Sequence, residues 1–483
     1  MQRQPIDYSR KWYVMAAVAV SIFLATVDGS IVNVALPTLV RDLKTDFPTV
    51  QWVILAYFLV QATLMLSIGR LGDMLGKKLI YAAGFVVFTV GSLLCGLSPT
   101  IFWLIGFRVV QAVGAAMMLA LGIAIVTEAF PPSERGKALG ITGTTVSVGI
   151  VVGPTLGGLL IDALSWHWIF FVNIPIGILG AWMAWQFVPD FKPVGRQRFD
   201  YVGAIVLFIS LLALLLALTL GQQLGFSQPG MLLLFAVWIV FLVAFIIIEW
   251  RTSQPMIDLR LFRNSLFSIN LVTGFATFVA IAGAMILMPF YLENILGYET
   301  RQVGLLMALV PIVLGVVAPI SGALSDRVGT RPIASVGLLA LLIGYYALST
   351  LDEQTTALGY LLRLLPIGIG MGVFQSPNNS AIMGAAPRER LGIASGLLSI
   401  TRTLGQIAGI AVLGAVWAGR VVFHTGAVLS GGATTASAAA QVAGLHDTLL
   451  TIVVLMGLAL LLSLWGLRQE RRLQRIAALQ ANP

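Results

Sequence analysis

The sequence predicts an all-α polytopic membrane protein, and three observations lead to that prediction. Hydrophobic residues make up 58% of the 483 residues and charged residues only 10%, whereas a water-soluble protein of this size needs a far more polar surface. The apolar residues form runs of about 20, the length that a helix needs to cross a hydrocarbon layer of roughly 30 Å. Basic residues are scattered in short segments between those runs, so the net charge of +9 does not indicate a nucleic-acid partner.

Fourteen apolar runs are long enough to form membrane-spanning helices. The first follows Arg3, Arg10 and Lys11, is too long for the core of a signal peptide and has no small-residue cleavage site at its end, so we expect it to remain as the first span. The predicted spans are residues 12–35, 50–69, 79–97, 101–124, 136–162, 167–188, 201–221, 230–249, 266–290, 303–324, 332–350, 357–383, 391–417 and 447–467.

The distribution of Lys and Arg predicts the orientation of these spans. If both termini are cytoplasmic, the cytoplasmic segments carry 22 of the 29 basic residues, the outer segments carry four, and Arg108, Arg363 and Arg402 fall within spans. Because inner loops are enriched in positive charge, we expect a multi-pass protein of a bacterial cytoplasmic membrane with both termini inside. Its tail, residues 468–483, forms either a basic amphipathic helix on the inner membrane surface or a solvated extension.

An internal repeat predicts how the spans are grouped. Gly69, Asp73 and Gly76 recur 253 residues later, and both Arg108 and the Pro-x-Glu-Arg segment that starts at Pro132 recur 255 residues later. This shift equals eight spans, so two halves of six spans in the same orientation flank an inserted pair, a plan typical of rocking transporters. The predicted parts are residues 1–199, the inserted pair 200–250, residues 251–467 and the tail 468–483.

Asp28 lies inside the first span and is the acidic residue farthest from a predicted membrane edge. An isolated charge in hydrocarbon costs several kcal/mol unless it is paired, neutralised or faces a wet cavity, so such a residue is a functional candidate. Arg108 in the fourth span is at a similar depth, roughly 10 Å, so the two side chains can meet. Burial favours the neutral form of Asp28, whereas Arg108 favours its charged form. A modest change in the surroundings can therefore switch the protonation of Asp28. A permanent structural ion pair is the alternative.

Several motifs resemble those of the major facilitator superfamily, specifically its fourteen-span drug:proton antiporters. Residues 149–158 match the antiporter motif of the fifth span at every defined position. Four other motifs depart at one or two positions, with Val27, Ser30, Met74, Ala112 and His167 where Leu, Thr, Arg, Gly and Arg are usual. They are residues 24–37, 69–78, 108–114 and 166–175, and residues 199–200 also resemble the family.

This resemblance implies the major facilitator fold, with two six-helix halves and two extra helices, and proton-coupled export by alternating access. The implied substrates are hydrophobic drugs or toxic compounds, cationic ones among them, as in multidrug efflux and antibiotic resistance. We expect no cofactor other than the proton gradient, and a monomer that works in the lipid bilayer. A dedicated exporter of one metabolite, lipid or siderophore is the alternative.

The motifs also supply candidate functional residues. Gly149, Gly153 and Gly157 are four residues apart on one helical stripe, and Pro154 removes a backbone donor, so this span can approach a neighbour closely and bend. With Gly158 they form the candidate antiporter motif, which in the resembled family seals the cavity on one side; ordinary small-residue packing is the compatible alternative.

Two further groups of residues are candidates for gating and for binding. Charged residues and two glycines at the cytoplasmic ends of the spans can latch the halves and release them, or can belong to solvated loops. They are Gly69, Asp73, Gly76, Lys77, Glu128, Arg135, Asp326 and Arg331. Amide side chains within spans can contact substrate or bond neighbouring helices; they are Asn33, Gln111, Gln375, Asn378 and Asn379.

Other classes of function find little support in the sequence. His167, His424 and His446 all lie at or outside the outer membrane boundary, so they provide no paired haem ligands, and no nucleophile–base pair or phosphate loop appears. The lone Cys95 excludes an intrachain disulfide and makes a metal site improbable. We therefore expect no enzymatic activity and no metal, although a receptor or scaffold that transports nothing stays open.

Overall fold

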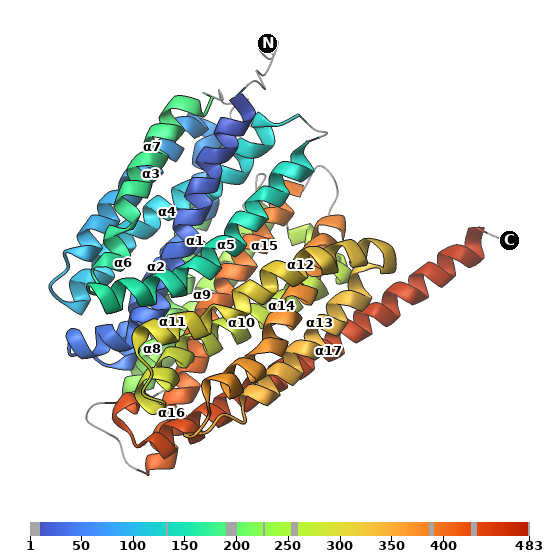
Figure 1. Cartoon of the computed structure of the whole chain (residues 1–483). Coiled ribbons are helices and arrows are strands. Elements are labelled where there is room, and N and C mark those ends of the chain that lie inside the picture. The colour runs from blue at the N-terminus through green and yellow to red at the C-terminus, as the bar shows by residue number, and fades with distance from the viewer. Residues whose placement is uncertain are drawn as a thin grey trace. The chain divides into compact units, whose positions relative to one another are not determined.

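The computed structural model describes residues 10–131, 134–189, 200–225, 228–252, 259–385, 391–426 and 432–481. Throughout these residues the secondary structure is helical, joined by short turns and without strands (Figure 1). An all-helical chain is what a bilayer requires, because a helix satisfies its own backbone hydrogen bonds where no water is present. The chain divides into two compact units, which are residues 1–256 with 292–308 and residues 257–291 with 309–483.

Unit 1 contains the described helices of the first half, the inserted pair and one short helix from the second half. The helices are α1 (Lys11–Asp42), α2 (Phe47–Leu75), α3 (Lys77–Gly96), α4 (Ile101–Ala129), α5 (Arg135–Ala163), α6 (Trp168–Phe171), α7 (Asn173–Phe187), α8 (Tyr201–Leu224), α9 (Pro229–Arg251) and the short α11 (Thr300–Met307). Its core lies among α1, α3 and α4, where the rings of Tyr81, Phe85 and Phe88 are fully buried.

Close approach of α3 to α4 depends on two glycines. A Cβ on Gly91 would collide with the backbone of Gln111, and one on Gly114 would collide with the backbone of Phe88. The helices therefore pack backbone to backbone, as small residues permit in membranes. This contact fixes the face of α4 that carries Arg108, so it also positions the site described below.

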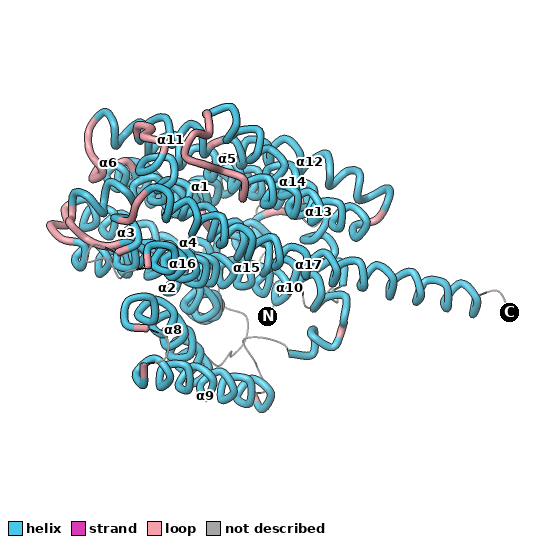
Figure 2. The backbone as a smooth tube through the Cα atoms, turned by 90° about the horizontal axis from the view of Figure 1, so that it is seen from below, coloured by secondary structure: helices cyan, strands magenta, loops and turns pink. Residues whose placement is uncertain are grey.

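The inserted helices α8 and α9 lie side by side (Figure 2). Of α9, only Met231, Phe245 and Glu249 are buried, and α8 makes the contacts that join the pair to α2. Their remaining apolar surface suits contact with lipid rather than a protein core.

Unit 2 is built from the remaining helices. They are a short helical turn (Leu259–Arg263), α10 (Ser265–Phe290), α12 (Leu309–Val328), α13 (Thr330–Leu348), α14 (Ala357–Ala385), α15 (Leu391–Ala408), a wide turn (Gly409–Leu413), α16 (Gly414–Thr425), a short turn (Ala433–Thr435) and α17 (Ala438–Ala481). Helix α14 packs between α12 and α13, while α10 contacts α14, α15 and α17. A wide turn at Tyr291–Ile295 follows α10 and leads into unit 1.

The predicted number of fourteen spans is not confirmed. Among the described residues, 12 helices are long and apolar enough to cross a membrane. The other two predicted spans, in α5 and α8, contribute shorter apolar helices, residues 148–163 and 201–214. Parts of α5 and α8 lie outside the residues whose side chains are described.

The last two helices extend beyond their predicted limits of 391–417 and 447–467. Helix α16 continues to Thr425 and α17 begins at Ala438, so the polar loop between them is short. The side chain of Gln441 donates to the carbonyls of Thr434 and Ala436, and Asp447 pairs with Arg420 across the two helices at 2.7 Å. These polar residues, whose low hydropathy suggests a loop, thus find hydrogen-bond or ion-pair partners within the helical structure. The backbone of α17 is helical through most of the predicted tail.

Candidate functional site

Asp28 of α1 and Arg108 of α4 form an ion pair inside unit 1. The Nη1 of Arg108 lies 2.6 Å from Oδ2 of Asp28, and both side chains have zero exposure. Both predicted residues therefore meet, and neither is accessible from outside in this state. A buried pair of this kind tolerates the loss of its water only if its remaining polar atoms are also hydrogen bonded.

The carboxylate of Asp28 accepts two further hydrogen bonds. Nε2 of Gln111 donates to Oδ1 at 2.8 Å, and Nδ2 of Asn173, at the start of α7, donates to the same atom at 3.0 Å. Three donors from α4 and α7 thus surround one carboxylate. Gln111 is three residues after Arg108 and shares its helix face, which is why one stretch of α4 supplies two of the donors.

Arg108 is held from several sides. Its Nε donates to the carbonyl of Val53 at 2.9 Å, and Nη1 donates to Oε1 of Gln111 at 2.7 Å. The ring of Tyr57 stacks 4.1 Å from the guanidinium carbon, and Phe170 lies 5.8 Å away. Aromatic faces stabilise a cation in a water-free site. The Nη2 atom has no hydrogen-bond partner among the described residues.

Two members of this network were not predicted from the sequence. Asn173 belongs to the motif of residues 166–175, and Tyr57 is one aromatic among many in the second span. A polar residue inside an apolar motif was the available signal for Asn173; nothing distinguished Tyr57. By contrast, the predicted Asn33 stays out of the network, because its amide donates to the carbonyls of Gly29 and Ser30 in its own helix.

We predict that Asn173→Ala destabilises the protein more than Asn33→Ala does. The first change removes a donor to a buried carboxylate, and hydrogen bonds to charged groups contribute about 1.5–3 kcal/mol. The second removes only bonds to carbonyls that are already used by the helix. Thermal unfolding of both variants in detergent measures the difference, and equal losses would show that Asn173 adds nothing to the ion pair.

The glycine motif of α5 packs against two helices. Gly149, Gly153 and Gly157 face α1, where added Cβ atoms would strike Thr26, Ser30 and Ile31. Gly158 faces α11 instead, and a Cβ there would stand 2.7 Å from the carbonyl oxygen of Thr300. Pro154 lies within the helix, and its carbonyl approaches Gly304 of α11. The predicted stripe therefore serves close packing, with α11 as one of its partners.

The predicted latch residues are found partly paired. Lys77 at the start of α3 forms an ion pair with Glu128 at the end of α4. In unit 2, Arg331 pairs at 3.0 Å with Glu470 of α17. The side chains of Asp73, Arg135 and Asp326 lie outside the described residues, and a Cβ on Gly69 would meet nothing within 4 Å.

Gly76 and Gly329 show the internal repeat in the backbone. Each is the residue between two consecutive helices, and each has φ +99° with ψ of 137° and 149°, respectively. Side chains are strongly disfavoured in this region, so glycine is required for the same sharp turn in both units. The repeat does not extend to the ion pair, however. Arg363, the counterpart of Arg108, bonds to Thr350 and the carbonyl of Gly359.

The three predicted amide residues of α14 differ in their burial. Gln375 and Asn379 are half-buried, whereas Asn378 is 2% exposed. Its Oδ1 atom has no partner among the described residues.

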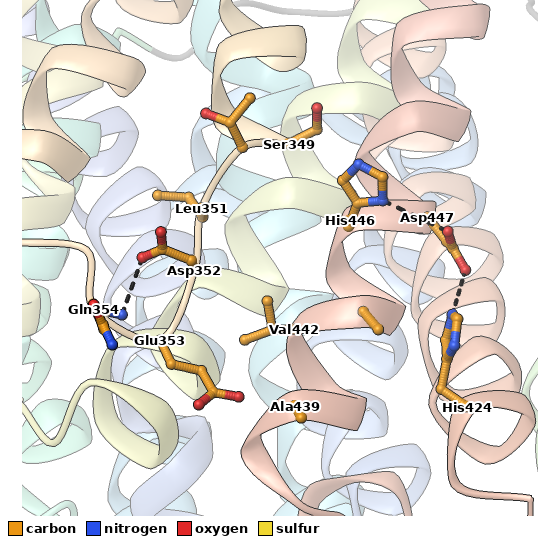
Figure 3. Close-up of a pocket in the computed structure, with 12 residues that line it drawn as sticks. Ser349, Leu351, Asp352, Glu353, Gln354, His424, Ala439, Val442, His446 and Asp447 are labelled. Atoms are coloured by element: carbon orange, nitrogen blue, oxygen red, sulfur yellow. Dashed lines mark hydrogen bonds and ion pairs between the residues drawn. The ribbon is translucent and has the colours of Figure 1, made fainter.

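A cavity of about 680 Å³ lies at the end of unit 2 that contains the loop after α13 (Figure 3). Asp352 and Glu353 in that loop line one side of the cavity, His446 and Asp447 of α17 line another, and His424 of α16 lies 2.7 Å from Asp447 (Figure 3). The hydroxyl of Thr355 and the backbone N–H of Gln354 donate to Asp352 and lower the pKa of its carboxyl. These charges lie at helix ends, far from mid-depth, and Asp447 is already paired with Arg420.

Comparison with known proteins adds a family and relatives to this geometry. Residues 18–410 match the family model of the Major Facilitator Superfamily. The chain is 35% identical over 421 residues to the riboflavin transporter RibZ of Clostridioides difficile, covering 86% of this chain and 90% of that protein. It is 34% identical over 405 residues to the multidrug resistance protein Stp of Mycobacterium tuberculosis, covering 84% of this chain and 75% of that protein. A bacterial homologue of the human lysosomal transporter Spinster, solved in an inward-facing and unoccupied conformation, has a TM-score of 0.67 at 19% identity, over 95% of this chain and 97% of that one.

Proposed function

This chain belongs to the major facilitator superfamily, and we propose that within it the chain is a proton-coupled antiporter that exports hydrophobic compounds, cationic ones among them. It is a membrane transporter and not an enzyme. The observation that carries the proposal is Asp28, a carboxylate with three buried donors in the interior of unit 1. An acid in such a place can bind and release a proton only when the surrounding helices rearrange, which is what coupling requires.

Similarity to the multidrug resistance protein Stp supports a broad range of substrates, and the glycine motif of α5 supports antiport. We extend the proposal to fourteen spans, to both termini in the cytoplasm of a bacterium, and to resistance against toxic compounds. The energy is sufficient, because one proton provides about 2.3 kcal/mol per 100 mV of membrane potential. A difference of one pH unit adds about 1.4 kcal/mol.

The proposal is tested with purified protein in acid-interior vesicles that contain a pH dye. Tetraphenylphosphonium and ethidium serve as lipophilic cations, and chloramphenicol serves as a neutral compound. Release of internal protons on addition of any of these compounds, absent from protein-free vesicles, is the expected result. If folded protein releases no protons with any compound, the multidrug proposal fails.

A dedicated exporter of one metabolite is the second candidate. The observation that favours it is the 35% identity to a riboflavin transporter along most of both chains. Riboflavin is therefore added to the same assay, and a response to riboflavin alone would select this function.

A further inference from the structure

Arg402 lies in the apolar part of unit 2, and among the described residues no acidic side chain pairs with it. It is the twelfth residue of α15, so it is roughly 16 Å along the helix from Leu391. Residues 265–290, 357–385 and 391–425, which form α10, α14, α15 and α16, contain no Asp or Glu. Among the described residues, the guanidinium forms no ion pair or hydrogen bond, and its contact is the ring of Phe278, 5.8 Å away.

An arginine at this depth is costly unless it has a partner. A charged side chain at the centre of a bilayer costs at least about 2.5–3.5 kcal/mol, and such residues usually mark pathways for substrates or ions. One aromatic face offsets only part of that cost. Because Arg402 is partly exposed, a group from outside the protein chain can reach it.

Two amide side chains, one from α10 and one from α14, lie along the face of α10 that carries Phe278. Asn270, Gly274 and Phe278 are spaced by four residues, so they share one face of that helix. The Nδ2 of Asn378 from α14 lies 3.1 Å from where a Cβ on Gly274 would stand, and Arg402 lies over Phe278, one turn further along. Asn270, Asn378 and the guanidinium of Arg402 therefore lie along one stripe, the face of α10 formed by Asn270, Gly274 and Phe278.

Both amides are buried with polar atoms that have no partner. Asn270 is 6% exposed and Asn378 is 2% exposed. The Nδ2 of Asn270 and the Oδ1 of Asn378 make no hydrogen bond within the described part of the chain. Buried polar groups are nearly always hydrogen bonded, and this stripe offers one guanidinium and two amides with atoms that have no partner among the described residues.

We propose that Arg402, Asn378 and Asn270 form a binding site for a carboxylate on a transported organic compound. The planar guanidinium presents parallel N–H donors that match the two oxygens of a carboxylate, and the amides supply further polar groups beside it. The proposal rests on the transport function proposed above and narrows its substrates. The proposed substrates are then acidic and zwitterionic compounds, either in addition to the lipophilic cations that the sequence suggests or instead of them.

The test measures binding by the full-length protein in nanodiscs of phosphatidylcholine. The probes are matched pairs of aromatic acid and amide, such as 2-naphthoate with 2-naphthamide and salicylate with salicylamide, followed by tryptophan fluorescence. We expect wild type to bind at least one acid about tenfold more tightly than its amide. Arg402→Gln should remove this preference, Arg402→Lys should keep part of it, and Arg363→Gln, the matched control in α14, should leave it unchanged.

Two results would overturn the assignment. In the first, wild type binds no acid more tightly than its amide; in the second, the preference for the acid persists in a folded Arg402→Gln variant. Adding phosphatidylglycerol to the nanodiscs, or inorganic phosphate to the buffer, identifies other occupants. If either displaces the acid probes at a concentration equal to theirs, the site belongs to a lipid headgroup or to a free anion rather than to a transported carboxylate.

The same measurements separate this inference from the proposed function. Asp28→Asn should retain the preference for carboxylates, because Asp28 belongs to unit 1 and the site to unit 2. Proton-coupled efflux without any preference for acids refutes the site and leaves antiport standing. Preference for acids without proton release supports the site and refutes antiport.

Discussion

Asp28→Asn is expected to lower proton-coupled efflux by roughly tenfold or more, a change in free energy of at least 1.4 kcal/mol. Asparagine has the size of the acid and can still accept from Gln111 and Asn173, but it cannot carry a proton on and off. The measurement is proton release from acid-interior vesicles for each compound that wild type exports. Efflux that stays equal to wild type would show that Asp28 is structural and that another group couples transport to protons.

The ion pair supplies its own control. Replacing either partner alone leaves an uncompensated buried charge, which typically costs about 3–5 kcal/mol. We therefore expect both Asp28→Asn and Arg108→Gln to melt at lower temperature than wild type. The double variant Asp28→Asn with Arg108→Gln should recover most of that stability and still show no coupling. Recovery of stability with persistent loss of coupling separates the functional role of the acid from its role in packing.

Gly304→Leu is expected to abolish transport by forcing α11 away from α5. A Cβ on Gly304 would collide with the carbonyl oxygen of Pro154, a backbone atom that no rotamer change can move. Overpacking of this kind usually costs about 1–3 kcal/mol and shifts the backbone. Efflux and thermal unfolding measure the two effects.

Gly106→Leu provides the matched control, because a Cβ at Gly106 of α4 meets nothing within 4 Å. It adds the same volume and the same apolar surface to a helix of the same unit, and we expect efflux close to wild type. Similar losses in both variants would show that added bulk, rather than contact between α5 and α11, decides the outcome.

The helices could be predicted from the sequence because a bilayer permits few other structures for apolar segments. The Asp28–Arg108 pair could be predicted because the number of residues from the end of a span gives the depth of a side chain in the membrane. It did not predict Asn173 as a donor to Asp28. That contact depends on how the segment before α7 packs against α1, which residue spacing does not determine. Tyr57 was missed for a similar reason, since apolar spans contain many aromatics and only tertiary packing selects the one beneath Arg108.

The ends of the last two spans were misplaced because hydropathy treats polar residues as loop. Arg420 pairs with Asp447, and the amide nitrogen of Gln441 donates to nearby carbonyls, so these polar side chains have partners within the helical structure. Arg402 was recognised only as an arginine within a span. Its lack of an acidic partner among the described residues became visible when α10 and α14, which contain no Asp or Glu, were found beside α15.

Helix α17 has a practical consequence. It runs without a break for 44 residues, about 65 Å at 1.5 Å per residue, which is roughly twice the thickness of the hydrocarbon layer. A soluble helical domain joined in register to its last turn would continue the same rod and be carried clear of the detergent belt. Such a rigid marker would give a small, otherwise featureless membrane protein a recognisable orientation in single-particle images, without altering any residue of either site.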